Sequence, residues 1–208
     1  PRLEEYEREK ICGGEPLIDQ VIAVIGPHNG LGLSALAPDG MGNWTAMPSE
    51  GGHSDLAPTN DLEDAVLKVL IAKYGHVSRE RAVSIPGLVE LWHCLGQIEN
   101  APEGEDEITA EEIVALAYTD HPRAKQAIRM QTEIFAGTAS DYALITGARG
   151  GVYLSGELLD LLDDLFDYEV FSQRFHAKGR VSSYVRDIPV FKVIAPDTEI
   201  VGISTLFE

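Results

Sequence analysis

Length, composition and charge already exclude several classes of protein. The chain has 208 residues, of which 44% are hydrophobic and 24% are charged. That is enough for one large globular domain or two small ones, and the composition excludes collagen and wholesale disorder. The formal net charge is −18. Because such a surface repels phosphate backbones and anionic lipid headgroups, we expect neither a nucleic acid nor a membrane as partner.

The cysteines and the apolar runs indicate the compartment. Cys12 and Cys94 are too few for a disulfide framework or a cysteine-rich metal site. The longest apolar runs are too short to cross a bilayer, and no basic, apolar leader opens the chain. We therefore expect a reduced, cytoplasmic protein. Cys94, beside His93, lacks the surroundings of a nucleophile and is interpreted as a buried structural thiol.

The N-terminal part has the pattern of short strands. The first ten residues are mostly charged and helix-forming. Residues 20–26 (QVIAVIG) then form an apolar run that ends in glycine, which is typical of a buried strand. Tight turns at 26–32 and 38–43 separate it from further strands at 33–36 and 45–47. Strands that follow one another across short turns indicate an antiparallel arrangement.

From Asn60 the apolar period becomes that of helices. Asn60 can cap a helix over 61–74, and Gly75 can end it. Thr109 and Glu112 form a capping-box pattern. Further helices are predicted at 86–98, 109–118, 122–144, 158–165, 169–175 and 198–206, with an acidic loop at 101–106 and strands at 150–156 and 189–194. We expect a mixed α/β (α+β) fold, with a mixed sheet, a helix-rich insertion and a single domain over 1–208.

One loop combines a carboxylate and an imidazole around two glycines. It reads Glu50-Gly51-Gly52-His53-Ser54-Asp55. Glycine allows the backbone to approach a ligand closely, and paired acceptors suit hydroxyl groups. A metal site formed by Glu50, His53 and Asp55 would lack a recognised ligand spacing. On these residues alone, a solvated polar turn is favoured.

Two glycine-rich stretches could present backbone N–H groups to a phosphate. They are GPHNGLG at 26–32 and GARGGVYLSG at 147–156. The first is not a Walker loop, because no Lys-Ser/Thr pair follows it, and a strand rather than a helix comes next, unlike a dinucleotide fingerprint. The alternative for the first stretch is a tight hairpin, and for the second it is the end of a helix followed by close packing.

A third polar segment runs from His76 to Arg81. Ser78 can cap the next turn, and the charges are expected to face solvent.

Taken in order, these motifs resemble the bacterial glucokinases, of the hexokinase and actin-like (ribonuclease H-like) ATPase superfamily. That family carries a GxGTGLG turn, an EGGH loop, GHVSxER, SxPGL, GxGGVYxxGG and a KGR segment before an IP strand. This sequence has GPHNGLG at 26, EGGHSD at 50, GHVSRER at 75, SIPGL at 84, GARGGVYLSG at 147 and AKGRVSSYVRDIPV at 177. The resemblance runs from about Cys12 to the end, and it implies the large domain of the family.

The resemblance implies phosphorylation of glucose by ATP with Mg²⁺, in a protein that tends to form homodimers. Carried over by motif, the glucose ligands are Glu50, His53 and Glu80, with Gly51 and Gly52 in the same loop. The nucleotide side is expected to comprise Gly26, Asn29, Gly30, Gly32, Gly150 and Gly151. In the family, a carboxylate of the small domain takes the proton from the sugar 6-hydroxyl. No catalytic residue and no metal ligand are therefore assigned to this chain.

The sequence departs from the family on the nucleotide side. No counterpart of the N-terminal domain is found, with its DxGGT loop and catalytic Asp-bearing Asn-Asp pair; Asp141 and Asp187 do not sit in such a context. His28-Asn29 replaces Gly-Thr in the first turn, and Glu157 replaces the second glycine of the last pair. In SxPGL, Ile85 replaces glycine. The sugar-side residues are intact.

Three hypotheses follow from these observations. The leading one is the large domain of a glucokinase that is inactive without the rest of the protein. The second is a non-catalytic glucokinase-like protein that binds a sugar or a partner. The third is a structural protein that oligomerises through its interdomain face. The first two predict that Glu50, His53 and Glu80 meet in one cleft, which requires the strand before Glu50 to return alongside the end of the helix over 61–74.

Overall fold

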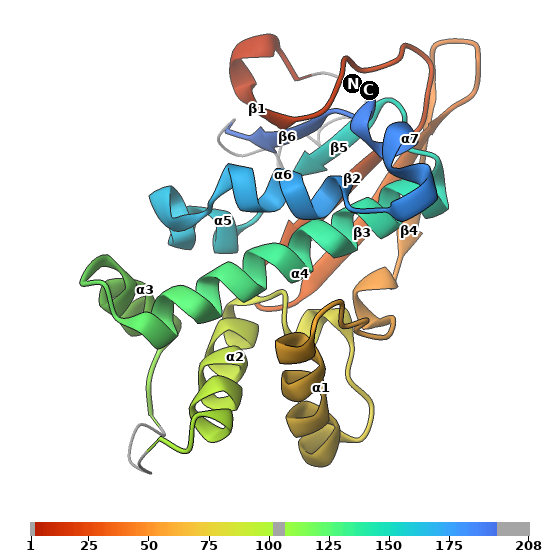
Figure 1. Cartoon of the computed structure of the whole chain (residues 1–208). Helices are drawn as coiled ribbons and strands as arrows, with labels where there is room; N and C mark the ends of the chain where they lie inside the picture. Colours follow the sequence, from red (N-terminus) through yellow and green to blue (C-terminus); the bar gives the residue numbers. More distant parts are fainter. Residues whose placement is uncertain (1–2, 102–106, 195–208) are drawn as a thin grey trace.

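A six-stranded mixed sheet organises the chain (Figure 1). The structure is a computed structural model that describes residues 3–101 and 107–194. The strand order is β1-β6-β5-β2-β3-β4. The strands are β1 (Arg8–Cys12), β2 (Ile22–Pro27), β3 (Leu31–Pro38), β4 (Trp44–Ser49), β5 (Gly151–Leu154) and β6 (Val190–Val193). The predicted mixed α/β fold and its mixed sheet are confirmed.

The middle of the sheet follows the predicted pattern. β2, β3 and β4 form an antiparallel meander, and β5 and β6 run parallel to β2. β2 lies between β3 and β5, and Ala23 and Ile25, on one of its faces, are fully buried. Val152 and Leu154 of β5 are fully buried as well. Ile22 and Tyr153, which point to the other face, are only 8% exposed. Strands covered on both faces read as continuous apolar runs, which is why these two strands were recognisable.

The described N-terminal residues, from position 3, differ from the expectation of helix. They form one 3₁₀ turn (η1, Glu5–Glu7) and the edge strand β1, which pairs antiparallel with β6. The Arg8 guanidinium lies 4.6 Å from the centre of the Phe191 ring and donates to the Tyr153 hydroxyl at 2.6 Å. The open edge of β6 and these aromatic contacts outweigh the weak helix propensity of the segment.

The helices agree closely with the capping signals. Asn60 Oδ1 accepts the backbone N–H of Glu63 at 2.8 Å, and Gly75 ends the helix at φ +77°. Thr109 forms the predicted capping box. The helices are α1 (Asp61–Tyr74), α2 (Ile85–Ile98), α3 (Ala110–Tyr118), α4 (Pro122–Thr146), α5 (Glu157–Leu162), α6 (Tyr168–His176) and α7 (Ser182–Arg186). The short α7 was not predicted, and the helix expected over 158–165 divides into α5 and a 3₁₀ turn, η4 (Asp163–Leu165). The helix expected over 198–206 and most of the acidic loop lie outside the described residues.

The long helix α4 lies at the centre of the fold. Figure 1 shows it running diagonally, with α6 and the sheet on one side and α1 and α2 on the other. Phe135 of α4 and Phe171 of α6 are buried edge to face, with ring centres 5.7 Å apart. Small buried residues on α4 let its neighbours approach closely, and they include Ala127, Ala136, Ala139 and Ala143. Within the described residues, no helix has the length and apolarity needed to cross a membrane.

Candidate functional site

Three loops meet where the strands β2, β4 and β5 end. We call this end of the strands the sheet edge, as distinct from the outer strands of the sheet. β2 ends at Pro27, which pairs with Leu31, and β5 ends at Leu154, which pairs with Ile25. β4 returns to the same edge and ends at Ser49, opposite Leu33. The turn 28–30, the loop 50–53 and the loop 155–157 therefore share this edge. Open α/β sheets bind ligands where the carboxyl ends of their parallel strands lie, so the edge is the natural place for a site.

Glu50, His53 and Glu80 come together at this edge, and we call them the EGGH cluster. His53 Nε2 lies 3.9 Å from Glu50 Oε2, and His53 Nδ1 lies 3.9 Å from Glu80 Oε1. The side chains of Glu50, His53 and Glu80 are 93%, 61% and 31% exposed, respectively. The predicted convergence is therefore present, while the role of these groups as sugar ligands stays a prediction.

The glycines of the loop allow its close passage over β3. A Cβ atom on the buried Gly52 would lie 2.1 Å from the carbonyl oxygen of Leu31. On Gly51, it would lie 3.0 Å from Ser49 Oγ. Gly51 and His53 bound a 3₁₀ turn, η2 (Gly51–His53), whose His53 N–H donates to the Glu50 carbonyl at 3.0 Å. Close packing on the neighbouring strand thus places the carboxylate and the imidazole on one short turn.

Glu80 reaches the cluster because the chain returns beside the loop after α1. Asp55 and Ser78 form an antiparallel bridge. The N–H of Arg79 donates to the Ser54 carbonyl at 2.9 Å. Glu80 sits on the next 3₁₀ turn, η3 (Arg79–Arg81), and its Oε2 accepts the backbone N–H of Leu31 at 2.9 Å. The return that the sequence required is thus confirmed.

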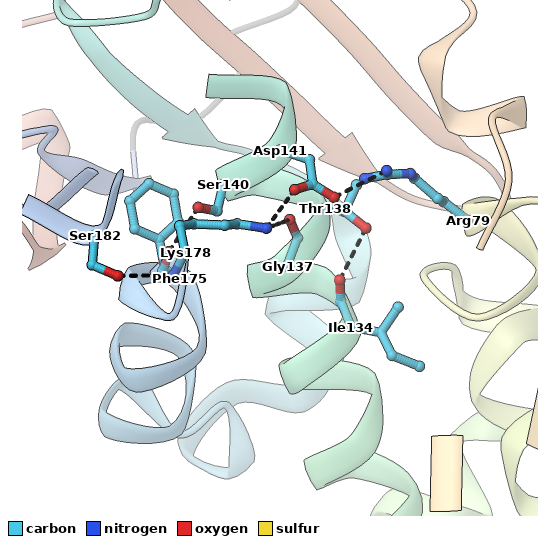
Figure 2. A network of polar contacts seen from close by, with 9 residues as sticks. All are labelled: Arg79, Ile134, Gly137, Thr138, Ser140, Asp141, Phe175, Lys178 and Ser182. Atoms are coloured by element: carbon cyan, nitrogen blue, oxygen red, sulfur yellow. Dashed lines mark hydrogen bonds and ion pairs between the residues drawn. The ribbon is translucent and has the colours of Figure 1, made fainter. Parts of the chain in front are cut away.

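The segment from His76 to Arg81 follows its expectation in part: His76 and Arg81 are exposed, but Ser78 does not cap the turn and Arg79 is largely buried. Ser78 precedes η3, but its side chain is buried and makes no capping hydrogen bond. The Arg79 side chain is only 15% exposed and donates from Nη2 to Asp141 Oδ2 at 3.0 Å (Figure 2). Tertiary contact with α4 therefore overrides the local pattern.

Asp55, which the sequence grouped with Glu50 and His53 as a conceivable metal site, has another partner. Its Oδ1 lies 2.8 Å from His76 Nε2. Over the described ranges 3–101 and 107–194, no three His, Cys, Asp or Glu side chains gather closely enough to hold a metal ion. The carboxylate of Asp55 thus belongs to an exposed pair beside the cluster rather than to the cluster itself.

The glycines of the 26–32 turn leave space that other parts of this chain occupy. A Cβ atom on Gly26 would lie 2.8 Å from the Ser155 carbonyl oxygen. On Gly30, it would lie 2.6 Å from Glu80 Oε2. Gly32 pairs with Gly26 and has only ordinary contact distances around it. Asn29 is exposed at the tip. Gly30 thus ties the predicted nucleotide turn to the EGGH cluster, a contact that the motifs did not reveal.

Gly150 and Gly151 lie at the opposite edge of the sheet from this turn. Gly151 begins β5 and pairs with Ile22, the first residue of β2, and Gly150 donates its N–H to the Val21 carbonyl. The structure therefore does not bring these two glycines together with the 26–32 turn. The glycine that does lie there is Gly156, on which a Cβ atom would meet the Pro27 carbonyl oxygen at 2.3 Å. Gly156 follows β5, whereas Gly150 and Gly151 lie at its start. This position after the strand is the signal in the sequence that could have identified Gly156.

Two residues that depart from the family motifs contact each other at this edge. His28 Nδ1 accepts the backbone N–H of Glu157 at 3.4 Å and lies 3.9 Å from Glu157 Oε2. The N–H of Ile85, the third departure, donates to the His28 carbonyl at 2.8 Å. The three residues that differ from the family motifs, His28, Glu157 and Ile85, are therefore in contact with one another through His28.

The two thiols are unsuited to nucleophilic chemistry. Burial raises the pKa of both Cys12 and Cys94 to about 11. A thiol with such a pKa carries almost no thiolate at neutral pH. Cys94 is buried on α2, as the interpretation of a structural thiol required.

A separate groove of about 560 Å³ lies along α2 and α3. Its lining is mostly apolar and contains none of the predicted site residues: Trp92, Ile108, Glu112, Ala115, Leu116 and Thr119. The polar groups suited to a hydroxylated ligand are those of the EGGH cluster.

Comparison with known proteins first places the chain in a structural class. It is similar to the crystal structure of a glucokinase from an Antarctic psychrotroph, with a TM-score of 0.89, 28% identity and coverage of 97% of this chain and 62% of that one. A glucokinase from Balamuthia mandrillaris, solved with glucose, shares the fold at a TM-score of 0.77 and 20% identity, over 91% of this chain and 55% of that one. The chain thus has the fold of the actin-like sugar kinases, as the resemblance implied.

The family follows from the sequence comparisons. A family model described as Glucokinase matches residues 1–208, so the chain belongs to the glucokinase family. The glucokinase of Chromobacterium violaceum is 36% identical over 205 residues, which cover 98% of this chain and 58% of that protein. A glucokinase-like protein of Caulobacter vibrioides is 38% identical over 207 residues, covering 100% of this chain and 63% of that protein. The chain thus spans about six-tenths of the length of these curated relatives.

Proposed function

We propose that this chain is the large, glucose-binding domain of a glucokinase, and that the whole protein transfers the γ-phosphate of ATP to the 6-hydroxyl of glucose. Membership of the glucokinase family supports the reaction class. The observation that carries the proposal for this chain is the meeting of Glu50, His53 and Glu80 at the sheet edge. We propose the single domain over 1–208 on the same grounds.

The chemistry of the EGGH cluster suits a sugar. Two carboxylates accept hydrogen bonds from hydroxyl groups, and an imidazole can donate or accept, so a hexose can bind through charge-assisted hydrogen bonds. Leu31 N–H holds one oxygen of Glu80, and this leaves Oε1, near His53, to face a ligand. Gly51 and Gly52 serve the site by letting the loop pack closely on β3, which places Glu50 and His53 side by side.

ATP and Mg²⁺ would serve the whole protein, but the residues at this edge fit them poorly. His28 Nδ1 takes the Glu157 N–H, a donor that an anion would otherwise use. The carboxylate of Glu157, 67% exposed, adds negative charge where a polyphosphate would lie. We therefore assign no step through the nucleotide to these residues and no catalytic residue to this chain.

The alternative is a non-catalytic glucokinase-like protein that binds a sugar or a partner. The contact between His28 and Glu157 favours it, because it uses the edge for internal contacts instead of leaving it open to phosphate. Both proposals predict glucose binding by the chain. They differ in whether the whole protein turns glucose over.

Two measurements on the purified chain test the proposal. Titration with glucose, followed by NMR, should show saturable binding that is millimolar or weaker, because part of the family's hydrogen-bond set lies outside this chain. An assay of glucose 6-phosphate formation with Mg-ATP should show no turnover, since loss of a general base alone typically costs about 10²–10⁴-fold. Absence of any glucose binding would refute the sugar site. Turnover that survives controls for contaminating kinases would refute the inactivity of the isolated chain.

We further propose that the protein works in glycolysis in the cytoplasm, as a homodimer, with glucose rather than nucleic acid or membrane as its partner. The net charge of −18 opposes binding to polyanions and anionic lipids. The family's tendency towards dimers supports the assembly. Sedimentation velocity over a range of protein concentrations should show a dimer, and a monomer at every concentration would contradict it.

A further inference from the structure

The segment that carries Glu80 has little local stabilisation. η3 is a single 3₁₀ turn, and Ser78 before it provides no side-chain capping bond. Short 3₁₀ turns have poor hydrogen-bond geometry, and one helical turn does not hold itself in water. The position of Glu80 must therefore be set by contacts with other elements.

Helix α4 contacts this segment on both flanks of Glu80. On one flank, Asp141 Oδ2 accepts from Arg79 Nη2 at 3.0 Å. On the other, the fully buried Gln131 donates from Nε2 to the carbonyls of Ala82 at 2.8 Å and Ser84 at 2.9 Å. The two α4 residues are ten positions apart, or about 15 Å along the helix axis. The turn is thus held between two fixed points of a rigid helix.

Ser84 completes the connection to the backbone of Glu80. Its hydroxyl donates to the Glu80 carbonyl at 2.8 Å and accepts the N–H of Gly87 at 3.0 Å, at the start of α2. The carbonyl of Ser84 is one of the two that Gln131 binds. A displacement of η3 relative to α4 would therefore move Glu80 with it.

Asp141 is shared between two cations from distant parts of the chain. Figure 2 shows Arg79 and Lys178 approaching its carboxylate from opposite sides. The side chains of Arg79 and Lys178 are only 15% and 14% exposed. Without Asp141, two largely buried cations would face each other, and repulsion would drive them apart. The charge of Asp141 thus holds Arg79 in place.

This network is not itself a ligand site. Arg79 Nε is buried and has no hydrogen-bond partner among the described residues, but the cavity that it lines measures only about 10 Å³. Such a space admits at most one water molecule. The network therefore acts through what it positions.

We propose that Asp141 is a positioning residue for the glucose site: by holding Arg79 it fixes η3, so that Glu80 keeps its carboxylate between the Leu31 N–H and His53. The relevance to glucose rests on the proposed function. The positioning itself can be measured without the sugar, because the Leu31 amide proton reports directly on Glu80 Oε2.

The test compares Asp141→Asn with Glu90→Gln in the 208-residue chain. Glu90 also pairs with a cation, Lys73, at 2.9 Å and is 19% exposed, but it joins α1 to α2. Its carboxylate also accepts from the Tyr74 hydroxyl, and its link to η3 is indirect, through the Tyr74 ring that lies under the Arg81 guanidinium. It therefore controls for a general loss of stability. Asp141→Asn should move the Leu31 amide proton upfield and speed its exchange, in the direction that Glu80→Ala produces. Glu90→Gln should leave that signal in place.

Glucose titration separates this inference from the proposed function. If wild type binds glucose, Asp141→Asn should weaken binding about tenfold or more, and Glu90→Gln should not. An unchanged Leu31 signal in Asp141→Asn would overturn the inference. Failure of wild type to bind glucose would refute the proposed function, while the Leu31 signal would still decide whether Asp141 positions Glu80.

Two further variants keep the test decisive if Asp141→Asn does not fold. Arg79→Lys retains the charge but loses the planar fork that reaches Asp141, so it should displace the Leu31 signal as well. Lys178→Met leaves the pair between Arg79 and Asp141 intact and should displace it less. The opposite order would contradict the proposal.

Discussion

Two loop clusters at the same sheet edge differ in what their polar groups contact. In the EGGH cluster, Glu50 and His53 face solvent, and the Leu31 N–H holds one oxygen of Glu80, while the other lies near His53. On the other side of the 26–32 turn, His28 and Glu157 contact each other. The EGGH cluster keeps hydrogen-bonding groups free for a ligand. In the pair of His28 and Glu157, part of the hydrogen-bonding capacity is used within the protein. Binding capacity is thus decided by partners within the fold as much as by residue type.

The two clusters also differ in their support. Contacts with α4 hold the turn that carries Glu80, through Asp141 and Gln131. The hydrogen bonds of His28 join it to Gly30 in its own turn, to the loop 155–157 and to the first residue of α2. Side chains held by rigid elements keep their geometry better than side chains held by loops.

The largest effect is expected from Gly52→Ala. The new Cβ atom would lie 2.1 Å from the Leu31 carbonyl oxygen, so η2 must move away from β3 and the EGGH cluster must open. Overpacking of this kind costs about 1–3 kcal/mol of stability. Gly32→Ala is the matched control, because its Cβ atom would meet Gly26 O at an ordinary 3.7 Å. Denaturant unfolding of both variants measures the difference, and equal stabilities would contradict the close packing of the loop.

A smaller effect, on glucose binding alone, is expected from Glu80→Gln. The amide oxygen can still accept the Leu31 N–H, but the charge offered to the sugar is lost, so binding should weaken about tenfold. Glu157→Gln and Asp55→Asn should change glucose affinity by less than about twofold, because neither carboxylate belongs to the cluster. NMR titration of the three variants ranks them. A comparable loss in Asp55→Asn would show that net charge, rather than geometry, governs binding.

The smallest effect is expected on the other side of the turn. The combined change His28→Gly, Asn29→Thr and Glu157→Gly removes the internal contact and one negative charge, so Mg-ATP should bind several-fold more tightly than to wild type. Isothermal titration measures both affinities. Micromolar binding by the wild-type chain would refute the interpretation of a filled nucleotide side. The glucose affinity of the combined variant should stay close to that of wild type, which keeps the two sides distinct.

Much of the fold could be predicted because its signals are local. The cap of α1 at Asn60 and its end at Gly75 depend on neighbours within one turn of the helix. The meander of β2, β3 and β4 depends on short turns between apolar runs. The meeting of His53 with Glu80 was also predictable, because ordered motifs indicated a family whose fold requires it.

The features that depend on contacts between distant segments were decided by the tertiary structure. β1 is a strand because β6 offers it an open edge, although its own residues favour helix. Gly151 and the 26–32 turn lie at opposite edges because β5 runs parallel to β2, a direction that no local signal encodes. The pairing of Arg79 with Asp141 spans 62 positions of sequence. Capping and periodicity act over a few residues, whereas register, strand direction and ion pairs are settled only when the core has formed.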